Sequence, residues 1–282
     1  MGQRLGKEKL MSYIKQFGFG EKTGIDLYGE EDGILFSLNR MGPVETATTA
    51  FGQGVSVTPI QQVMGVSAAI NGGYLMKPFL VKYISNSNTN ELIKNYEPIV
   101  KRQVISESTS KTVRYALENV VATGTGRNAF INNYRVGGKT GTAQKVKDGH
   151  YLDNNYILSF IGFTPADDPE VVVYVAIDNP KGVTQYGGTV SAPIAKAVLE
   201  DCINILNIPK SKEGIERTYE LWDTKYYLVP NLIGLTKKEA KKKVGINLQL
   251  EYSGVGEKIL HQSPEEGSYL PQNGTIKIML NN

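Results

Sequence analysis

The sequence predicts an α+β fold in which helices pack on an antiparallel sheet, followed by a small second α+β domain. Strand-like patterns occur at about residues 134–146, 156–163 and 170–177. A Pro-containing turn at 165–169 joins the last two, as in a hairpin. A long helical pattern follows at about 190–206. Helices, then consecutive strands, then a helix is the order typical of α+β domains.

Helical patterns also precede the strands. Thr58, which is followed by Pro59, is the expected N-cap of one helix, and Ser108 is the expected N-cap of another. Residues 74–105 between these two helices look extended, with a polar break at 85–90. Apolar spacing places the helices at residues 5–17, 45–50, 59–70 and 109–121.

The tail differs in composition from the rest of the chain. Residues 209–225 are polar and weakly periodic, which is typical of a linker. We therefore expect one domain at 1–208 and a second at 226–282. In the second, Thr236 is the expected cap of a lysine-rich helix that ends near Val244. Strand-like pieces follow at 246–252, 259–262 and 275–280.

Composition excludes several classes of function. A net charge of +3 is too small to indicate a nucleic-acid partner, and no apolar run reaches the length of a membrane span. Cys202 is the single cysteine, and His150 and His261 stand apart, so no disulfide framework, metal cluster or Ser-His pair is expected. A solvated helix face is the interpretation favoured for the basic residues of the tail, Lys237, Lys238, Lys241, Lys242 and Lys243.

Chemistry is most strongly indicated by residues 137–144, Gly-Gly-Lys-Thr-Gly-Thr-Ala-Gln. Glycines beside Lys139 allow a backbone or a ligand to approach closely. A strand edge can pair with an extended peptide, one of its N–H groups can hold an oxyanion, and hydroxyls can bind a carboxylate. The alternative is an ordinary glycine-rich strand with an exposed lysine, because short motifs recur by chance.

The triplet Lys139-Thr140-Gly141 resembles the third signature element of penicillin-binding proteins and serine β-lactamases, which follows Ser-x-x-Lys and Ser-x-Asn elements. The resemblance extends over about residues 1–207 and implies part of the transpeptidase fold of that family. Residues 226–282 resemble a PASTA module, which points to the division and sporulation class. The blocks that carry the resemblance are Phe17-Gly18-Phe19-Gly20, Thr23-Gly24-Ile25-Asp26-Leu27, Phe51-Gly52-Gln53-Gly54, Thr58-Pro59-Ile60-Gln61, Asn71-Gly72-Gly73, Gly124-Thr125-Gly126, Val136 to Gln144 and, in the tail, Val229-Pro230-Asn231-Leu232-Ile233-Gly234 and Gln262-Ser263-Pro264.

The resemblance implies D,D-transpeptidation of peptidoglycan stem peptides at the extracytoplasmic face of a bacterial membrane, with no metal or organic cofactor. Lys139 would tune the field around the nucleophile and relay protons. The hydroxyls of Thr140 and Thr142 would bind the substrate carboxylate, and the Thr142 N–H would form half of the oxyanion hole. Gly141 would permit close approach, and Gln144 belongs to the substrate-binding set. β-Lactams and other cell-wall synthesis proteins are the further partners implied.

The nucleophile is expected to be absent from this chain. Ser-x-x-Lys patterns begin at Ser12 and Ser108, and a Ser-x-Asn begins at Ser37. Ser12 falls inside a helix, in a segment that resembles family sequence lying after the Ser-x-Asn element. We therefore expect a truncated reading frame or a fragment, with apolar faces exposed where a central helix is missing. Loss of a serine nucleophile costs roughly a million-fold in turnover, so the chain alone is expected to be inactive.

Two other functions remain open from the residues. The chain could be a non-catalytic module that docks on peptidoglycan or on partner proteins. It could also derive from a β-lactamase, although the PASTA-like tail disfavours that class.

Overall fold

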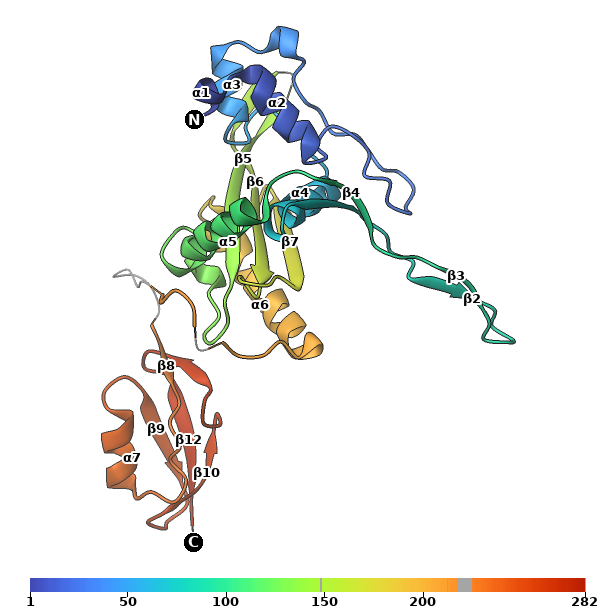
Figure 1. The fold of residues 1–282 in the computed structure, drawn as a ribbon. Coiled ribbons are helices and arrows are strands. Elements are labelled where there is room, and N and C mark those ends of the chain that lie inside the picture. The colour runs from blue at the N-terminus through green and yellow to red at the C-terminus, as the bar shows by residue number, and fades with distance from the viewer. Residues whose placement is uncertain (148, 212, 218–224, 282) are drawn as a thin grey trace. The chain divides into compact units, whose positions relative to one another are not determined.

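A computed structural model describes residues 1–147, 149–211, 213–217 and 225–281. The chain divides into two compact units, Met1–Arg217 and Thr218–Asn282, and each has its own hydrophobic core (Figure 1). Helices and antiparallel sheets together confirm the predicted α+β class. Part of the expected linker, residues 212 and 218–224, lies outside the described residues.

The first unit is centred on a three-stranded antiparallel sheet in the order β5-β6-β7. The strands are β5 (Gly137–Lys147), β6 (His150–Thr164) and β7 (Val171–Asp178), which confirms the three predicted strands. In the register, Lys139 lies opposite Ile161, which in turn lies opposite Tyr174. Strand β5 therefore forms one edge of this sheet.

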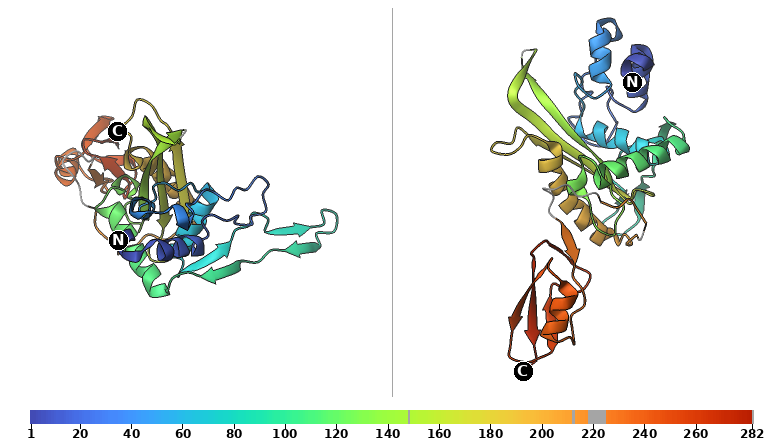
Figure 2. Two further views of the ribbon diagram at one scale, coloured as in Figure 1. Left: turned by 90° about the horizontal axis from the view of Figure 1, so that it is seen from above. Right: turned by 90° about the vertical axis from the view of Figure 1, so that its left-hand side faces the viewer.

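Helices cover both faces of the sheet (Figure 2). On one face α6 (Gly187–Leu206) buries Ala195 and Leu199 against Phe160 of β6. On the other face α4 (Pro59–Ile70) and α5 (Glu107–Ala122) pack through Ile70 and Leu117 against Phe163. Burial of large side chains such as these supplies most of the driving force for folding.

Helix α4 begins at the predicted cap. Thr58 Oγ1 accepts a hydrogen bond from the Gln61 backbone N–H, and Gln61 Oε1 accepts one from the Thr58 N–H. The Gln61 side chain is only 1% exposed. Its Nε2 also donates to the carbonyl oxygens of Glu21 and Asp32, both at 2.8 Å. One buried amide thus caps the helix and fixes the loop that precedes it.

Three predicted helix boundaries were wrong. Gly6, at φ +84°, divides the first helix into α1 (Gly2–Leu5) and α2 (Lys7–Gln16). Ser106, not Ser108, caps α5, because its Oγ accepts from the Thr109 N–H while Ser108 already lies in the first turn. Helix α6 starts at Gly187, before the predicted position. The shorter elements of this unit are η1 (Leu38–Arg40), α3 (Pro43–Thr49) and η2 (Arg127–Ala129).

A β-ribbon arm projects from the body of the first unit, between α4 and α5 in sequence (Figure 1). The loop carrying Asp26 anchors its base: Oδ1 and Oδ2 accept from the N–H groups of Leu80 and Val81 at 2.8 and 3.0 Å. The arm consists of β1 (Tyr74–Lys77) paired with β4 (Ile99–Gln103) and β2 (Tyr83–Ser85) paired with β3 (Leu92–Asn95).

The second unit is a small α+β domain. Thr236 caps its helix as predicted and forms a capping box with Glu239. Its core is lined by residues such as Leu232, Ile276 and Ile278, all at most 1% exposed. The elements are β8 (Tyr226–Leu228), α7 (Lys237–Val244), β9 (Gln249–Ser253), β10 (Ile259–Ser263), β11 (Tyr269–Pro271) and β12 (Thr275–Leu280), with the sheets ordered β10-β12-β9 and β11-β8.

Acidification is expected to release the base of the arm. Hydrogen bonds from the N–H groups of Val81 and Leu80 hold the pKa of Asp26 below its ordinary value of 3.8. Its contribution to stability is therefore complete above that value and is lost as the pH falls through the lower folded-state pKa. We predict that hydrogen-exchange protection of the Leu80 and Val81 amides decreases below about pH 4.

The Asp26→Asn variant tests this prediction, because a neutral amide cannot offer two equivalent acceptor oxygens. It should show reduced protection of both amides already at neutral pH and a flatter dependence on pH. Asp168→Asn, which alters an exposed carboxylate in the turn between β6 and β7, is the control and should behave as the wild type. Equal protection in Asp26→Asn and wild type would contradict the assignment.

Candidate active site

The sequence-predicted residues lie together on β5, at the open edge of the sheet. Lys139 and Thr142 are exposed, whereas Thr140 and Gly141 are half-buried. Gly137 and Gly138, which precede the lysine, are buried. The edge leaves backbone groups of β5 without a partner strand among the described strands, so that it can accept an added strand.

The glycines before the lysine have a packing reason that the sequence did not show. A Cβ atom on Gly137 would lie 2.3 Å from Phe163 Cζ, and one on Gly138 would lie 2.4 Å from Phe160 Cζ. These glycines therefore accommodate two buried rings of β6 rather than a ligand. Gly141 faces the Ser159 hydroxyl, because a Cβ there would be 2.4 Å from its Oγ.

A cavity of about 240 Å³ lies beside Lys139. The Lys139 Nζ donates to the Thr140 carbonyl oxygen at 2.9 Å. Apolar side chains form much of the wall, so a charge there is less well solvated than in water. The lining residues are Gln62, Val66, Leu117, Gly138, Lys139, Thr140, Gly141, Ser159, Ile161, Phe163 and Tyr174.

Thr140 and Thr142 share the other face of β5, because side chains alternate along a strand. Thr142 Oγ1 accepts a hydrogen bond from the N–H of Gly187, at 3.4 Å, where α6 begins. Thr140 Oγ1 lies 3.0 Å from Thr125 Oγ1, within hydrogen-bonding distance. Two hydroxyls on the strand edge thus sit in front of a helix start and a neighbouring turn.

The start of α6 approaches the strand closely because two glycines occupy it. A Cβ atom on Gly187 would lie 2.3 Å from the Ser159 carbonyl oxygen and 2.5 Å from that of Gly141. No acidic residue occupies the first turn, and the N-cap Tyr186 makes no side-chain capping bond. The positive end of the helix dipole is therefore available near Thr142, which favours an anion there. The Gly187-Gly188 pair was missed in the sequence, although two glycines before a helical pattern were a usable signal.

Gln144 follows Thr142 by two positions, and its amide is occupied. Its Nε2 donates to the Leu152 carbonyl oxygen across the β5–β6 hairpin, at 3.1 Å. Next to it, Lys145 forms an ion pair with Asp178 of β7 at 2.7 Å. Both side chains stabilise the hairpin beyond the Lys-Thr-Gly segment.

None of the serines in the motif-like patterns lines the cavity beside Lys139. Ser12 lies exposed on α2, where its Oγ accepts from Gln16 Nε2 at 3.1 Å. Ser37 precedes η1, and Ser108 lies in the first turn of α5. The serine that does line this cavity is Ser159 of β6.

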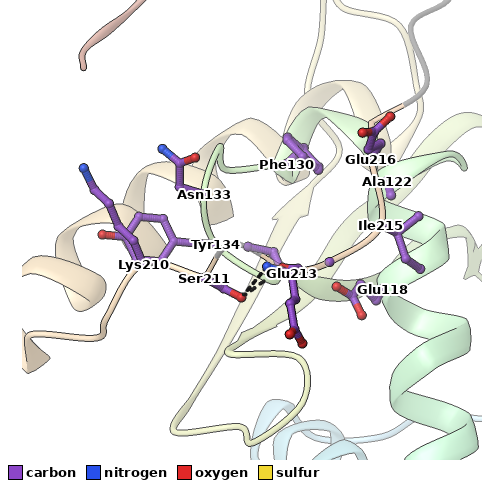
Figure 3. A pocket seen from close by; sticks show the side chains of 12 residues that line it. Glu118, Ala122, Phe130, Asn133, Tyr134, Lys210, Ser211, Glu213, Ile215 and Glu216 are labelled. Carbon is purple, nitrogen blue, oxygen red and sulfur yellow. Dashed lines mark hydrogen bonds between the residues drawn. The ribbon is translucent and has the colours of Figure 1, made fainter. Parts of the chain in front are cut away.

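A larger cavity, of about 390 Å³, contains none of the predicted site residues (Figure 3). It forms where residues 210, 211 and 213–216, beyond α6, lie over α5 and the segment before β5. The Ser211 N–H donates to the Asn133 carbonyl oxygen at 2.8 Å. On its wall, Glu118 of α5 pairs with Arg135 at 2.7 Å, and Glu118 is only 3% exposed. This ion pair ties α5 to the sheet.

The described part of the chain has neither a candidate metal site nor a candidate membrane span. No cluster of three or more His, Cys, Asp and Glu side chains is arranged to hold a metal ion there. None of its helices combines the length and apolar character that crossing a bilayer requires.

Comparison with known proteins decides the family. The chain matches the penicillin binding protein transpeptidase domain over residues 1–200 and the PASTA domain over residues 227–282. The chain belongs to the penicillin-binding protein transpeptidase family. This confirms the resemblance inferred from the ordered sequence blocks.

Individual relatives of this penicillin-binding protein agree. It is 58% identical to stage V sporulation protein D of Bacillus subtilis over 280 residues, 99% of this chain and 43% of that protein. It is 33% identical to the probable peptidoglycan D,D-transpeptidase PenA of Neisseria meningitidis, over 75% of this chain and 35% of that protein. The chain thus spans less than half the length of these curated relatives.

Solved structures show the same fold. Penicillin-binding protein 3 of Mycobacterium tuberculosis, complexed with ampicillin, superposes with a TM-score of 0.69 at 28% identity, covering 77% of this chain and 51% of that one. Penicillin-binding protein 2X of Streptococcus thermophilus gives a TM-score of 0.65 at 25% identity, covering 99% of this chain and 42% of that one.

The closeness of α6 to the strand edge can be tested with Gly187→Ala. The added methyl group would clash with two carbonyl oxygens and must push α6 away from β5, which should destabilise the first unit by about 2–3 kcal/mol. Thermal unfolding of the chain measures this. Thr189→Ala, an exposed change in the same first turn, is the control and should cost less than about 1 kcal/mol. Equal stability of the two variants would show that the glycine contact is not tight.

Proposed function

We propose that this chain forms the Lys-Thr-Gly side of a serine-type D,D-transpeptidase site that cross-links peptidoglycan stem peptides. The observation that carries the proposal is the open edge of β5, which bears Lys139, Thr140 and Thr142 and where the Gly187 N–H at the start of α6 donates to Thr142 Oγ1. An ammonium group, two hydroxyls and a helix N-terminus together suit the terminal carboxylate of a peptide. The names of relatives, which include peptidoglycan D,D-transpeptidases, support this class of reaction.

A stem peptide would lie along β5 as an added strand, with main-chain hydrogen bonds to the strand edge. Its C-terminal carboxylate would accept from the hydroxyls of Thr140 and Thr142. The carbonyl of the bond to be broken would then place its oxygen near the backbone N–H of Thr142, which would stabilise the oxyanion. Gly141 keeps this stretch of the strand free of side-chain bulk.

The reaction would pass through an acyl-enzyme. A serine hydroxyl attacks the carbonyl carbon, the terminal D-alanine leaves with a proton, and the amine of another stem peptide displaces the serine. Lys139 would favour the negative charge that develops and pass the proton to the leaving amine. We propose that the serine comes from polypeptide outside these 282 residues, because Ser12, Ser37 and Ser108 do not line the cavity beside Lys139.

The same site would accept β-lactams, which mimic the peptide and acylate the serine. The structural relative complexed with ampicillin supports this extension. Such a reaction belongs at the extracytoplasmic face of a bacterial membrane, where other cell-wall synthesis proteins would be the neighbours. The intact enzyme is a protein that joins this chain to Ser-x-x-Lys and Ser-x-Asn elements.

Labelling with a fluorescent penicillin tests whether the nucleophilic serine lies outside this chain. The chain of 282 residues should not be labelled covalently, whereas the intact enzyme should be. Covalent labelling of the 282-residue chain that disappears in Ser12→Ala or Ser159→Ala would place the nucleophile within this chain. An intact enzyme that binds peptidoglycan but is never acylated would instead favour a non-catalytic docking module.

Lys139 should matter for the chemical step. In the intact enzyme, Lys139→Gln should lower the second-order rate constant of acylation by roughly 100-fold or more, the range expected for a proton-transfer group. Lys145→Gln on the same strand removes only a surface ion pair and should have little effect. Stopped-flow or gel-based acylation kinetics give both values, and similar rates for the two variants would refute the role of Lys139.

A further inference from the structure

The exposed side chain of Thr125 lies beside the strand edge, in the turn that follows α5. Its Oγ1 is 3.0 Å from Thr140 Oγ1, and either oxygen can be the donor. The Gly126 N–H donates to the Val120 carbonyl oxygen at 2.9 Å, which holds the turn against the end of the helix. Thr125 is not part of the Lys-Thr-Gly segment.

Proton counting gives this contact a direction. A hydroxyl has one proton and two acceptor positions. If Thr140 gives its proton to a substrate carboxylate, as the proposed function requires, its oxygen can only accept from Thr125. Thr125 must then be the donor, and in doing so it holds the Thr140 proton toward the substrate.

Thr142 shows the same arrangement in a fixed form. Its Oγ1 accepts from the Gly187 N–H, and a backbone N–H cannot reverse its role. The proton of Thr142 is therefore free for an external acceptor. Each of the two strand hydroxyls thus has a hydrogen-bond partner on a neighbouring element. For Thr142 it is the backbone N–H at the start of α6, and for Thr140 it is a side chain that can rotate.

The turn that carries Thr125 is held closely in place. A Cβ atom on Gly188 would lie 2.3 Å from the Thr125 carbonyl oxygen and 3.4 Å from Thr140 Cγ2. Gly188 therefore packs closely against both threonines. Its carbonyl oxygen accepts a hydrogen bond from Asn128 Nδ2 at 2.8 Å. Groups held this way need little rearrangement when a ligand binds.

We infer that Thr125 is a positioning residue of the transpeptidase site, which orients the Thr140 hydroxyl as a donor to the substrate carboxylate. This inference rests on the proposed function. It assigns Thr125 a role in recognising the carboxylate and none in the attack on the carbonyl carbon.

A pair of probes that differ only at the carboxylate separates this role from a structural one. The probes are benzylpenicillin and its methyl ester, reacted with the intact enzyme. Thr125→Val should lower the acylation rate constant for the free acid about tenfold, because the Thr140 hydroxyl is then no longer held as a donor to the charged carboxylate. The rate constant for the ester should change less than about twofold. Thr125→Ser, which keeps the hydroxyl, should restore the wild-type ratio of the two rates.

Three further variants complete the experiment. Thr125→Ala repeats the test with a smaller side chain should the valine impair folding. Thr123→Val changes a hydroxyl of the same turn that donates to the Asn119 carbonyl oxygen, and should leave the ratio unchanged. In a Thr140→Val background, the Thr125 substitution should add no further loss, because it acts through Thr140.

The outcomes are distinct. The positioning role would be overturned if Thr125→Val lowered the acylation rate constants for acid and ester equally. It would also be overturned if the Thr125 substitution lowered the rate constant for the acid just as much in the Thr140→Val background. Wild-type behaviour of both Thr125→Val and Thr125→Ala would also overturn it, while leaving the proposed function intact. If unmodified intact enzyme is not acylated by benzylpenicillin, the proposed function itself fails and this inference falls with it.

Discussion

The first unit depends on one close backbone contact, between the start of α6 and strands β5 and β6. Gly187 makes it possible, because a side chain there would overlap the carbonyl oxygens of Ser159 and Gly141, and Gly188 likewise leaves room for the carbonyl oxygen of Thr125 in the neighbouring turn. The contact brings the helix N–H groups to Thr142 and closes the core formed by Phe160 and Leu199. Packing of the core and polarity of the site therefore have the same origin.

Strand β5 is buried and fixed where it begins, and exposed further along its edge. Gly137 and Gly138 admit the rings of Phe163 and Phe160, so that the beginning of β5 is buried and fixed. Within a few residues the strand emerges, and Lys139 and Thr142 become exposed. Functional groups mounted on such a buried strand keep their geometry better than groups on a loop. An edge that remains unpaired would be a hazard in most proteins, whereas here it is the proposed binding surface.

Polar side chains hold the irregular segments. The Gln61 amide connects a helix start to two loop carbonyls, and the Asp26 carboxylate holds the base of the arm through two backbone N–H groups. Glu118 and Arg135 join α5 to the sheet in a similar way. The buried Gln61 and Glu118 side chains satisfy backbone or charged partners that would otherwise be desolvated at a cost of about 1–3 kcal/mol. These contacts explain how long loops keep a defined path around a small sheet.

Local chemistry in the sequence determined a good part of this protein. Thr58 and Thr236 predict the starts of their helices, because capping depends on residues only three positions apart. Strand periodicity placed Lys139 on β5. The short strands β8 and β11 followed from a tertiary pairing that leaves no local period. Only the folded chain placed Thr125 beside Thr140, fifteen residues later in sequence, and the start of α6 beside Thr142. Caps and periodicity are short-range properties of the chain, whereas the meeting of a turn, a strand edge and a helix start is decided by how the whole core packs.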